Sequence, residues 1–344
     1  CPQPYTHRPP GAETKPDGSG YTVFTPFKKR WLAHPFAEPS APLPPPDAQG
    51  PPVPASSAPD QTGGIKKTFG ANFWGAGEIA AQQSLAEFLR CRAEHYNQIR
   101  DLPDQPGTSR LSAHLAIGTI SVSQCLYAAY KANKQRLSGG NEGIDTWISE
   151  LIWREFYNHI LAANPRLSRG EPFRQETEQL RWNDNDEWLD RWKSGETGFP
   201  LVDAGMKQLN ATGWMHNRLR MVTSQFLAKH LFINWRQGER YFMRNLVDGD
   251  FASNNGGWQW SASTGTDAVP YFRMFNPVRQ AERFDPSGAF VREHVPELAN
   301  ATGKSIFTPW QYTDTSHYPK PVVDLSSARD ATLAEWKRIR KAPS

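Results

Sequence analysis

One stretch of the sequence places four chemically useful side chains at helical spacing. Glu150, Trp153, Arg154 and Tyr157 occur at i, i+3, i+4 and i+7, so a helix would bring them onto one face. A carboxylate, an indole, a guanidinium and a phenol can together accept a hydrogen bond, stack on a ring and hold a phosphate. Proteins grip an unstacked nucleobase and its backbone in this way. On this helix alone, an exposed polar face with a half-buried tryptophan is the more ordinary interpretation.

A second stretch repeats this pattern. Asn217, Arg220, Met221 and Ser224 share one helical face, and Arg218 stands beside it. The simple alternative is a basic helix surface on which methionine fills the core. Two such faces in one chain favour a cavity that both of them line.

Residues 248–267 read DGDFASNNGGWQWSASTGTD and are the least ordinary part of the chain. Their glycines would allow the backbone to approach a ligand closely. Asp248 and Asp250 could accept hydrogen bonds from ring N–H groups or from a ribose. No Gly-Lys-Ser/Thr follows, so this is no phosphate-binding P-loop. A metal site is a weak alternative, because no histidine or third carboxylate is suitably spaced.

Residues 108–112, TSRLS, directly precede an apolar run with helical period. Their hydroxyl groups could cap the following helix and, together with Arg110, hold a phosphate at its N-terminus. Capping alone is the commoner meaning of such a string.

The elements that position these residues are predicted to be helices throughout. Ser121 and Gln124 fit a capping box, and no run of alternating strands occurs. We therefore expect an all-α fold with a long irregular loop over residues 248–277. Helical periodicity begins near Glu78 and continues from Val122 through Tyr130 until Gly139 and Gly140 stop it. It recurs at 144–163, 185–193, 201–210, 215–234, 236–247 and 328–341.

Composition divides the 344-residue chain unevenly. Sixteen of the 29 prolines lie in the first 60 residues, and nine of the 13 tryptophans lie between Trp147 and Trp260. Proline breaks helix and sheet, so we expect an irregular Pro-rich connecting segment at 1–77 and a helical domain at 78–344. Within the first segment, the aromatic stretch 21–32 could dock on another element.

Charge and cysteine content exclude several classes of protein. The formal net charge of +4 is mild and permits a nucleic-acid partner only if the arginines cluster. Three cysteines make no disulfide scaffold and show no metal-ligand spacing. No apolar run reaches the ~20 residues of a membrane helix, so no association with a membrane is expected. No bound metal is expected either.

Four motifs together resemble one family. TSRLSAHLAIGTIS, ELIWREFYNHIL, TGWMHNRLRM and DGDFASNNGGWQWSASTGTD resemble the photolyase/cryptochrome flavoproteins, most closely the class I cyclobutane pyrimidine dimer photolyases, over roughly 20–340. Met221 differs from the histidine of (6-4) photolyases and from the glutamine usual in the DASH branch. Asn254 differs from the aspartate common in plant cryptochromes.

The resemblance implies a helical domain that holds FAD. Arg220 and Asp248 would pair against the flavin ring, and Asn254 would face its reactive nitrogen. The residues that the resemblance assigns to the cofactor are Tyr96, Thr108, Ser109, Arg110, Leu111, Ser112, Trp147, Arg220, Asp248, Gly249, Asp250 and Asn254.

The resemblance also implies a reaction, in which light-excited reduced FAD passes an electron to a flipped-out pyrimidine dimer and later regains it. Glu150 would hydrogen-bond the dimer, Trp153 and Trp260 would stack on it, and Met221 would pack under it. The assigned lesion and DNA residues are Arg100, Glu150, Trp153, Arg154, Tyr157, Asn217, Arg218, Met221, Trp260 and Arg273. Trp258, Trp235 and Trp182 match the chain of tryptophans that carries electrons to oxidised flavin.

The leading expectation is therefore light-driven repair of UV-damaged DNA by a monomer. The alternatives are a cryptochrome-like photoreceptor without repair activity and a flavin-free helical DNA-binding module. The family's N-terminal α/β domain is missing from this chain, so binding of an antenna chromophore, a folate or a deazaflavin, is in doubt. We expect a cytoplasmic location for a bacterial source; a nuclear or organellar one stays open for a eukaryotic source.

Overall fold

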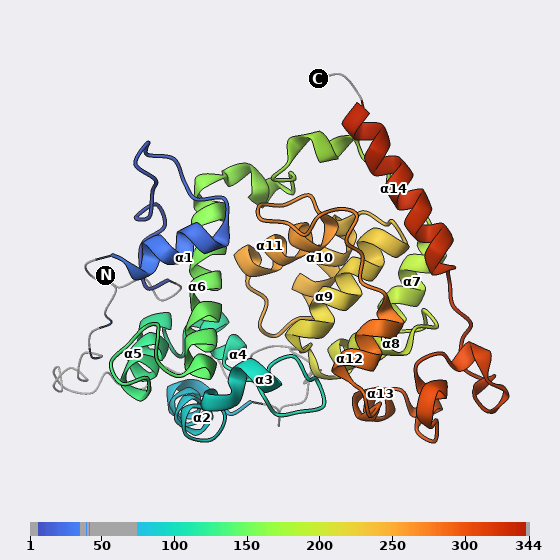
Figure 1. Ribbon diagram of the computed structural model, residues 1–344, viewed down its shortest axis with the longest axis horizontal. Helices are drawn as coiled ribbons and strands as arrows, with labels where there is room; N and C mark the ends of the chain where they lie inside the picture. The colour runs from blue at the N-terminus through green and yellow to red at the C-terminus, as the bar shows by residue number, and fades with distance from the viewer. Residues whose placement is uncertain (1–5, 35–38, 40, 42–73, 342–344) are drawn as a thin grey trace, which may run out of the picture.

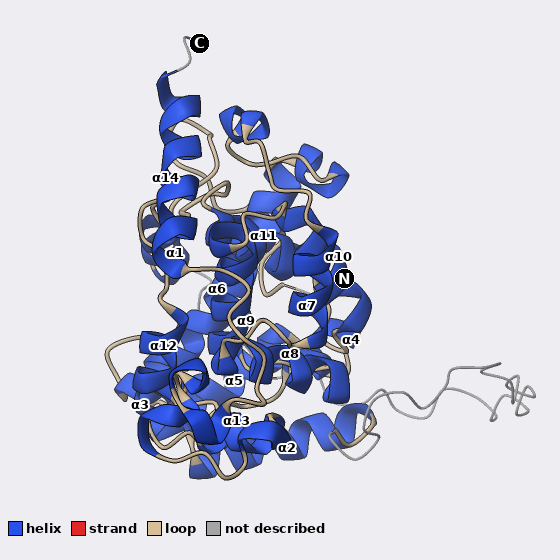
Figure 2. Cartoon of the chain, turned by 90° about the vertical axis from the view of Figure 1, so that its right-hand side faces the viewer, coloured by secondary structure: helices blue, strands red, loops and turns tan. Residues whose placement is uncertain are grey.

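The computed structural model describes residues 6–34, 39, 41 and 74–341, and this part of the chain is helical without a β-strand (Figures 1 and 2). An all-α fold is thus confirmed. The α-helices are α1 (Phe24–Leu32), α2 (Gly77–Cys91), α3 (Tyr96–Ile99), α4 (Ser112–Ile117), α5 (Val122–Ala132), α6 (Glu142–Ala163), α7 (Asp186–Ser194), α8 (Pro200–Thr212), α9 (Asn217–Gln225), α10 (Trp235–Asn245), α11 (Phe251–Ala262), α12 (Pro277–Phe284), α13 (Ala289–His294) and α14 (Leu325–Lys341).

The helices enclose two large hydrophobic cores. One core gathers apolar side chains of α1, α2, α4, α5 and α6, among them Phe88 and Phe156. The other gathers those of α7 to α13, among them Trp192 and Phe226. Helix α6 stands beside α11 in Figure 1 and packs on it. The two cores therefore meet where α6 packs on α11.

Helix α6 begins and ends where the sequence provides signals. The side chain of Asn141 accepts hydrogen bonds from the N–H groups of Gly143 (2.9 Å) and Ile144 (3.1 Å), which have no partner inside the helix. Asn164 and Pro165 follow its last turn, since proline disfavours a helical residue before it.

The predicted capping box before α5 is confirmed. The N–H of Gln124 donates to Ser121 Oγ at 3.1 Å, and the N–H of Ser121 donates to Gln124 Oε1 at 2.8 Å.

The prediction of an irregular loop over 248–277 was wrong, because α11 occupies the middle of it. Asp250 caps this helix by accepting a hydrogen bond from the N–H of Ser253 at 2.9 Å. The glycines that disfavour a helix in isolation are needed for packing: a Cβ added to Gly256 would overlap the Tyr157 ring of α6. Tertiary contact thus outweighs intrinsic propensity here.

Two further segments differ from the sequence-based expectation. The predicted helix 215–234 is divided into α9 and a π-helix, Phe226–His230, which contains the buried Lys229. The Pro-rich first segment contains α1, which takes up most of the aromatic stretch at 21–32. Phe27 and Trp31 of α1 are buried, and α1 packs against α6.

Candidate active site

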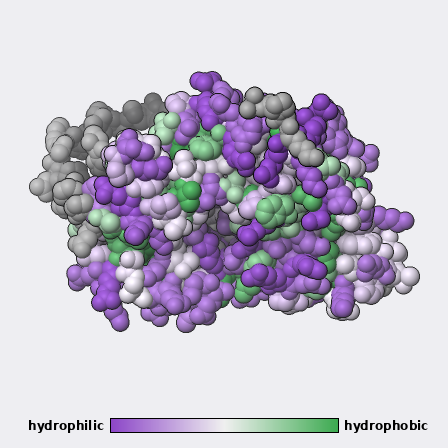
Figure 3. Space-filling model, turned by 45° about the horizontal axis from the view of Figure 1, so that its top comes forward, coloured by the Kyte–Doolittle hydropathy of each residue, from purple (hydrophilic) through white to green (hydrophobic). Residues whose placement is uncertain are grey.

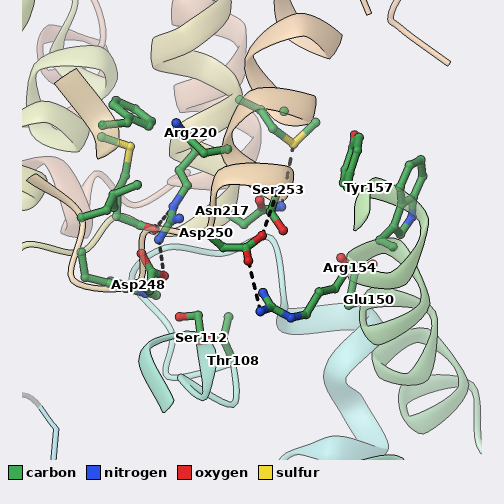
Figure 4. A pocket seen from close by; sticks show the side chains of 18 of the residues that line it. Thr108, Ser112, Glu150, Arg154, Tyr157, Asn217, Arg220, Asp248, Asp250 and Ser253 are labelled. Carbon is green, nitrogen blue, oxygen red and sulfur yellow. Dashed lines mark hydrogen bonds and ion pairs between the residues drawn. The ribbon is translucent and has the colours of Figure 1, made fainter. Parts of the chain in front are cut away.

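A cavity of about 500 Å³ lies between α6, α9, α11 and the segment at 108–112 (Figure 4). From α6, Glu150, Trp153, Arg154 and Tyr157 all line it. The i, i+3, i+4, i+7 face that the sequence predicts is therefore the face that meets the cavity.

Helix α9 supplies the facing wall. Asn217, Arg220, Met221 and Ser224 all line the cavity, as the shared helical face predicts. The hydroxyl of Ser224 donates to that of Ser261 on α11 at 2.7 Å. This bond links the two helices at the cavity wall.

Two ion pairs order the acidic residues (Figure 4). Arg220 Nη2 lies 2.7 Å from Asp248 Oδ2, and Arg154 Nη2 lies 3.1 Å from Asp250 Oδ2. The carboxylate of Asp248 is almost completely buried, and its Oδ1 has no hydrogen-bond partner in the part of the chain that the structure describes. A buried acceptor without a partner is costly, so this oxygen suits a donor supplied by a ligand.

The segment at 108–112 forms one end of the cavity, and each of its five residues lines it. Arg110 adopts a φ of 52°, which is uncommon for a residue other than glycine. Its guanidinium lies over the ring of Trp214 at 5.1 Å from the centroid. Ser112 then begins α4, but the expected capping is not found, because the N-cap residue is Leu111 and no side chain caps it. The hydroxyls of this segment remain beside the N–H groups of the helix start, where an anion is readily bound.

Glu150 is held by an arginine. Arg100 Nη1 donates to Glu150 Oε1 at 2.6 Å, and the Arg100 guanidinium lies 5.3 Å from the centroid of Tyr96. Burial alone would lower the pKa of Arg100, but the adjacent Glu150 carboxylate raises that pKa overall. Burial also raises the pKa of Tyr96 well above its usual value. Arg100 therefore stays charged and Tyr96 neutral.

Asn254 lines the cavity from α11 with a fixed amide. Its Nδ2 donates to the backbone oxygen of Glu239 at 3.1 Å. Burial raises the pKa of the Glu239 carboxyl behind it. The hydrogen bond orients the asparagine for contact with a group in the cavity.

Most of the residues predicted for the site meet at this cavity. Four of the arginines and three of the carboxylates in the described chain line it, so positive charge slightly exceeds negative charge. The predicted residues that line it are Tyr96, Arg100, Thr108, Ser109, Arg110, Leu111, Ser112, Glu150, Trp153, Arg154, Tyr157, Asn217, Arg220, Met221, Asp248, Asp250, Asn254, Trp258 and Trp260.

The structure places six predicted residues outside the cavity wall: Trp147, Gly249, Arg218, Arg273, Trp235 and Trp182. Trp147 is buried against Phe88, with ring centroids 5.0 Å apart. Arg218 pairs with Asp101 at 2.9 Å and lies over the Phe284 ring. Arg273 is exposed on the segment after α11.

The three tryptophans expected to carry electrons differ in exposure. Trp258 and Trp235 are buried in the second core, and Trp182 is half-buried at its margin. Gly238 lets α10 approach α11, because an added Cβ there would overlap the Trp258 indole. Trp192, which sequence reasoning did not single out, lies edge-on to Trp258 with centroids 5.9 Å apart.

Sequence reasoning also missed several cavity residues. Trp214 stands inside the motif TGWMHNRLRM, and that position was its one signal. The others are small or apolar side chains whose role depends on how the helices pack. The missed lining residues are Trp214, Met215, Phe242, Leu246, Ser253, Gly257 and Ser261.

The residues present fit the expected FAD. The cavity volume falls within the range of small-molecule sites, about 300–1,000 Å³. The hydroxyls of 108–112 and Arg110 suit phosphates, and the unpartnered Asp248 Oδ1 suits an N–H donor of a heterocycle or a ribose hydroxyl.

Among the described residues, no group of three or more His, Cys, Asp or Glu side chains could hold a metal ion. None of the helices in the described ranges is both long and apolar enough to cross a bilayer.

Comparisons with known proteins agree with this geometry. A profile described as the FAD binding domain of DNA photolyase matches residues 147–338. The deoxyribodipyrimidine photo-lyase of Escherichia coli (strain K12) is 45% identical over 342 residues, covering 97% of this chain and 71% of its own.

Solved structures are similar as well. A bacterial class III photolyase from Agrobacterium tumefaciens superposes with a TM-score of 0.89 at 36% identity, covering 98% of this chain and 72% of that one. An archaeal photolyase from Sulfolobus tokodaii with two FAD molecules gives a TM-score of 0.68 at 36% identity, covering 78% of this chain and 57% of that one.

Proposed function

This chain belongs to the DNA photolyase family, and we propose that it binds FAD and repairs cyclobutane pyrimidine dimers in UV-damaged DNA with light. One observation carries the proposal beyond family membership. The residues suited to a dinucleotide cofactor and those suited to a nucleobase line the same cavity. A donor and an acceptor of an electron would therefore lie next to each other.

One set of residues would hold the cofactor. When bound, FAD supplies absorption of blue or near-UV light and one-electron reduction of the dimer. The segment at 108–112 would hold its phosphates, and Asp248 would accept a hydrogen bond from it. Arg220 holds the Asp248 carboxylate in place at 2.7 Å, so this acceptor needs no reorganisation when the cofactor binds.

A second set would bind the dimer. Trp153 and Trp260 offer aromatic surfaces for stacking, which is favourable for any base. Glu150 would accept a hydrogen bond from the pyrimidine edge, with Asn217 beside it. Arg100 holds Glu150 in place through an ion pair of 2.6 Å. A damaged pair is poorly stacked and costs less to flip out of the duplex, which favours lesions over intact DNA.

The test is illumination of the purified, reduced protein with an oligonucleotide that contains one thymine dimer. We expect thymine absorbance to return with light and not in the dark. If flavin absorbance is present and no thymine returns, the cryptochrome-like photoreceptor becomes the better proposal. If no flavin absorbance is present, the flavin-free DNA-binding module becomes the better proposal.

Trp153→Ala tests the stacking role. We expect it to lower affinity for the dimer by about 1–3 kcal/mol, the usual value of one base–aromatic stack, and to leave flavin bound. Trp310 packs on Phe199 away from the cavity, so Trp310→Ala serves as the control for loss of a tryptophan. Loss of flavin from Trp153→Ala, with dimer affinity unchanged, would contradict the role.

We further propose a monomer and, for a bacterial source, a cytoplasmic location. The face in Figure 3 is mostly hydrophilic, with small scattered hydrophobic areas, which supports a chain without an obligate partner on that side. A cytoplasmic location would give the protein access to the bacterial chromosome, which supports this part of the proposal. Light scattering of the purified protein tests the oligomeric state, and a dimeric mass would overturn the proposed monomer.

A further inference from the structure

The aromatic ring of Phe24, at the start of α1, stacks on the indole of Trp153. The two ring centroids lie 3.6 Å apart and the ring planes differ by 9°. The residues are 129 positions apart in the sequence, so only the fold brings them together. We propose that Phe24 is a positioning residue that holds Trp153 for the lesion; this rests on the proposed function of Trp153.

Three aromatic rings pack against Trp153. Phe24 covers one of its faces, and Phe156 meets it edge-on with centroids 5.6 Å apart. Tyr157 approaches at a centroid distance of 5.6 Å with the planes tilted by 30°. Trp153 itself lines the cavity, so the ring surface that Phe24 does not cover remains for a ligand.

The stacked Phe24 is itself fixed by the chain segment that follows α11. Its backbone N–H donates to Asp267 Oδ2 at 3.0 Å, and the hydroxyl of Thr266 donates to the backbone oxygen of Thr22 at 2.5 Å. Trp260 belongs to α11, immediately before this segment. The start of α1 therefore stacks on Trp153 and is also hydrogen-bonded to the segment that directly follows the helix of Trp260. These are the two tryptophans proposed to stack on the dimer.

The rest of α1 anchors this arrangement to α6. Phe27 packs on Phe156 at a centroid distance of 5.3 Å and on His159 at 5.2 Å, without a ring contact to Trp153. Phe24 and Phe27 are therefore both buried phenylalanines of one helix that packs on α6, but of the two only Phe24 has a ring contact with Trp153 within the described residues. This difference provides a matched pair for experiment.

The physical effect is preorganisation. An indole that is free to change rotamer loses that freedom when the dimer stacks on it, and affinity falls accordingly. An aromatic pair of this kind corresponds to about a three- to tenfold change in an equilibrium constant. Removing the Phe24 ring should therefore weaken the dimer complex without weakening general attraction to DNA.

The experiment compares Phe24→Leu, Phe24→Met and Phe27→Leu in the flavin-loaded protein. Affinity is measured by fluorescence anisotropy for a dimer-containing oligonucleotide and for the undamaged one. We expect Phe24→Leu and Phe24→Met to weaken dimer binding about three- to tenfold and to leave undamaged DNA unaffected. We expect Phe27→Leu to change neither affinity. A fourth variant, Phe24→Tyr, keeps an aromatic ring and should bind the dimer as tightly as the unmodified protein.

A double mutant separates this inference from the proposed function. In a Trp153→Ala background, Phe24→Leu should cause no further loss, because its effect acts through the indole. Equal losses from Phe24→Leu and Phe27→Leu, or no loss from Phe24→Leu while Trp153→Ala binds weakly, would overturn the role of Phe24 alone. Full dimer affinity in Trp153→Ala would overturn the proposed stacking function itself.

Discussion

Trp258 and Trp260 stand two positions apart on α11 and have different surroundings. Both line the cavity, but Trp258 is only 2% exposed and packs among Trp192, Phe242 and Gly238, whereas Trp260 is half-buried. Residues two apart on a helix point to nearly opposite sides. One residue type can therefore provide an electron path into the core and a stacking surface for a ligand.

Replacing Trp258 tests the electron path. We expect Trp258→Phe to slow photoreduction of oxidised FAD strongly and to leave repair by the pre-reduced protein nearly unchanged, because phenylalanine is far harder to oxidise. Trp258 Nε1 has no hydrogen-bond partner among the described residues, so the stability cost should be limited to packing, about 1–3 kcal/mol. Transient absorption of the flavin measures the photoreduction.

The control for this experiment is Trp192→Phe, since Trp192 also touches Trp258. Its indole N–H donates to the backbone oxygen of Thr223 at 3.0 Å, so its loss should cost stability. An equal slowing in both variants would place Trp192 in the path, and an unchanged rate in Trp258→Phe would remove the relay assignment.

At the scale of elements, the sequence predicted the helices that carry a regular apolar stripe and failed where packing decides. The face of α6 at Glu150, Trp153 and Tyr157 follows from spacing alone and is found at the cavity. Helix α11 was missed, because its Gly and Asn residues have poor intrinsic helix propensity. Gly256 shows the reason: the absence of a side chain there lets α11 approach α6, and no local pattern encodes that approach.

The buried Lys229 in the π-helix forms hydrogen bonds to the chain segment that follows α11. Its Nζ donates to the backbone oxygens of Arg273 (3.0 Å) and Pro270 (3.4 Å), which belong to the segment after α11. Burial lowers the pKa of Lys229 from 10.5 to about 7. Between those pH values the unfolded chain binds a proton that the folded chain does not, so stability should rise with pH in this window.

Lys229→Met removes this dependence. The free energy of unfolding of the unmodified protein minus that of Lys229→Met should increase between pH 7 and pH 9, by at most about 1.4 kcal/mol per pH unit. Urea unfolding at the two pH values measures it. Thr332→Val removes only the hydrogen bond to the backbone oxygen of Lys229 and should keep the pH dependence. A difference that is constant with pH would show that Lys229 titrates as in the unfolded chain.

At the scale of the whole molecule, the sequence predicted the cavity better than it predicted the architecture around it. The division into segment 1–77 and domain 78–344 stays a prediction. Helix α1 lies within that segment, yet it shares a core with α6 and stacks on the proposed lesion site through Phe24. Such a contact joins residues far apart in the chain, so no local periodicity could have revealed it.

The distribution of charge over the molecule gives a prediction about DNA binding. Three of the four arginines expected at the DNA already have a carboxylate partner: Arg100 with Glu150, Arg154 with Asp250, and Arg218 with Asp101. Arg273 is exposed and has no ion pair within the described chain. Paired arginines offer less net charge to a phosphate, so Arg273 should dominate the dependence of affinity on salt.

Arg273→Ala should therefore reduce the slope of log affinity against log salt by about 0.7–0.9, the value of one phosphate contact on single- or double-stranded DNA. Titrations with dimer-containing duplex at several salt concentrations measure this slope. Arg244→Ala, which removes an exposed arginine of α10 outside the cavity, should leave the slope unchanged. Equal slopes for the unmodified protein and Arg273→Ala would mean that Arg273 makes no phosphate contact. The salt dependence would then have to come from the paired arginines, whose carboxylates would need to release them when DNA binds.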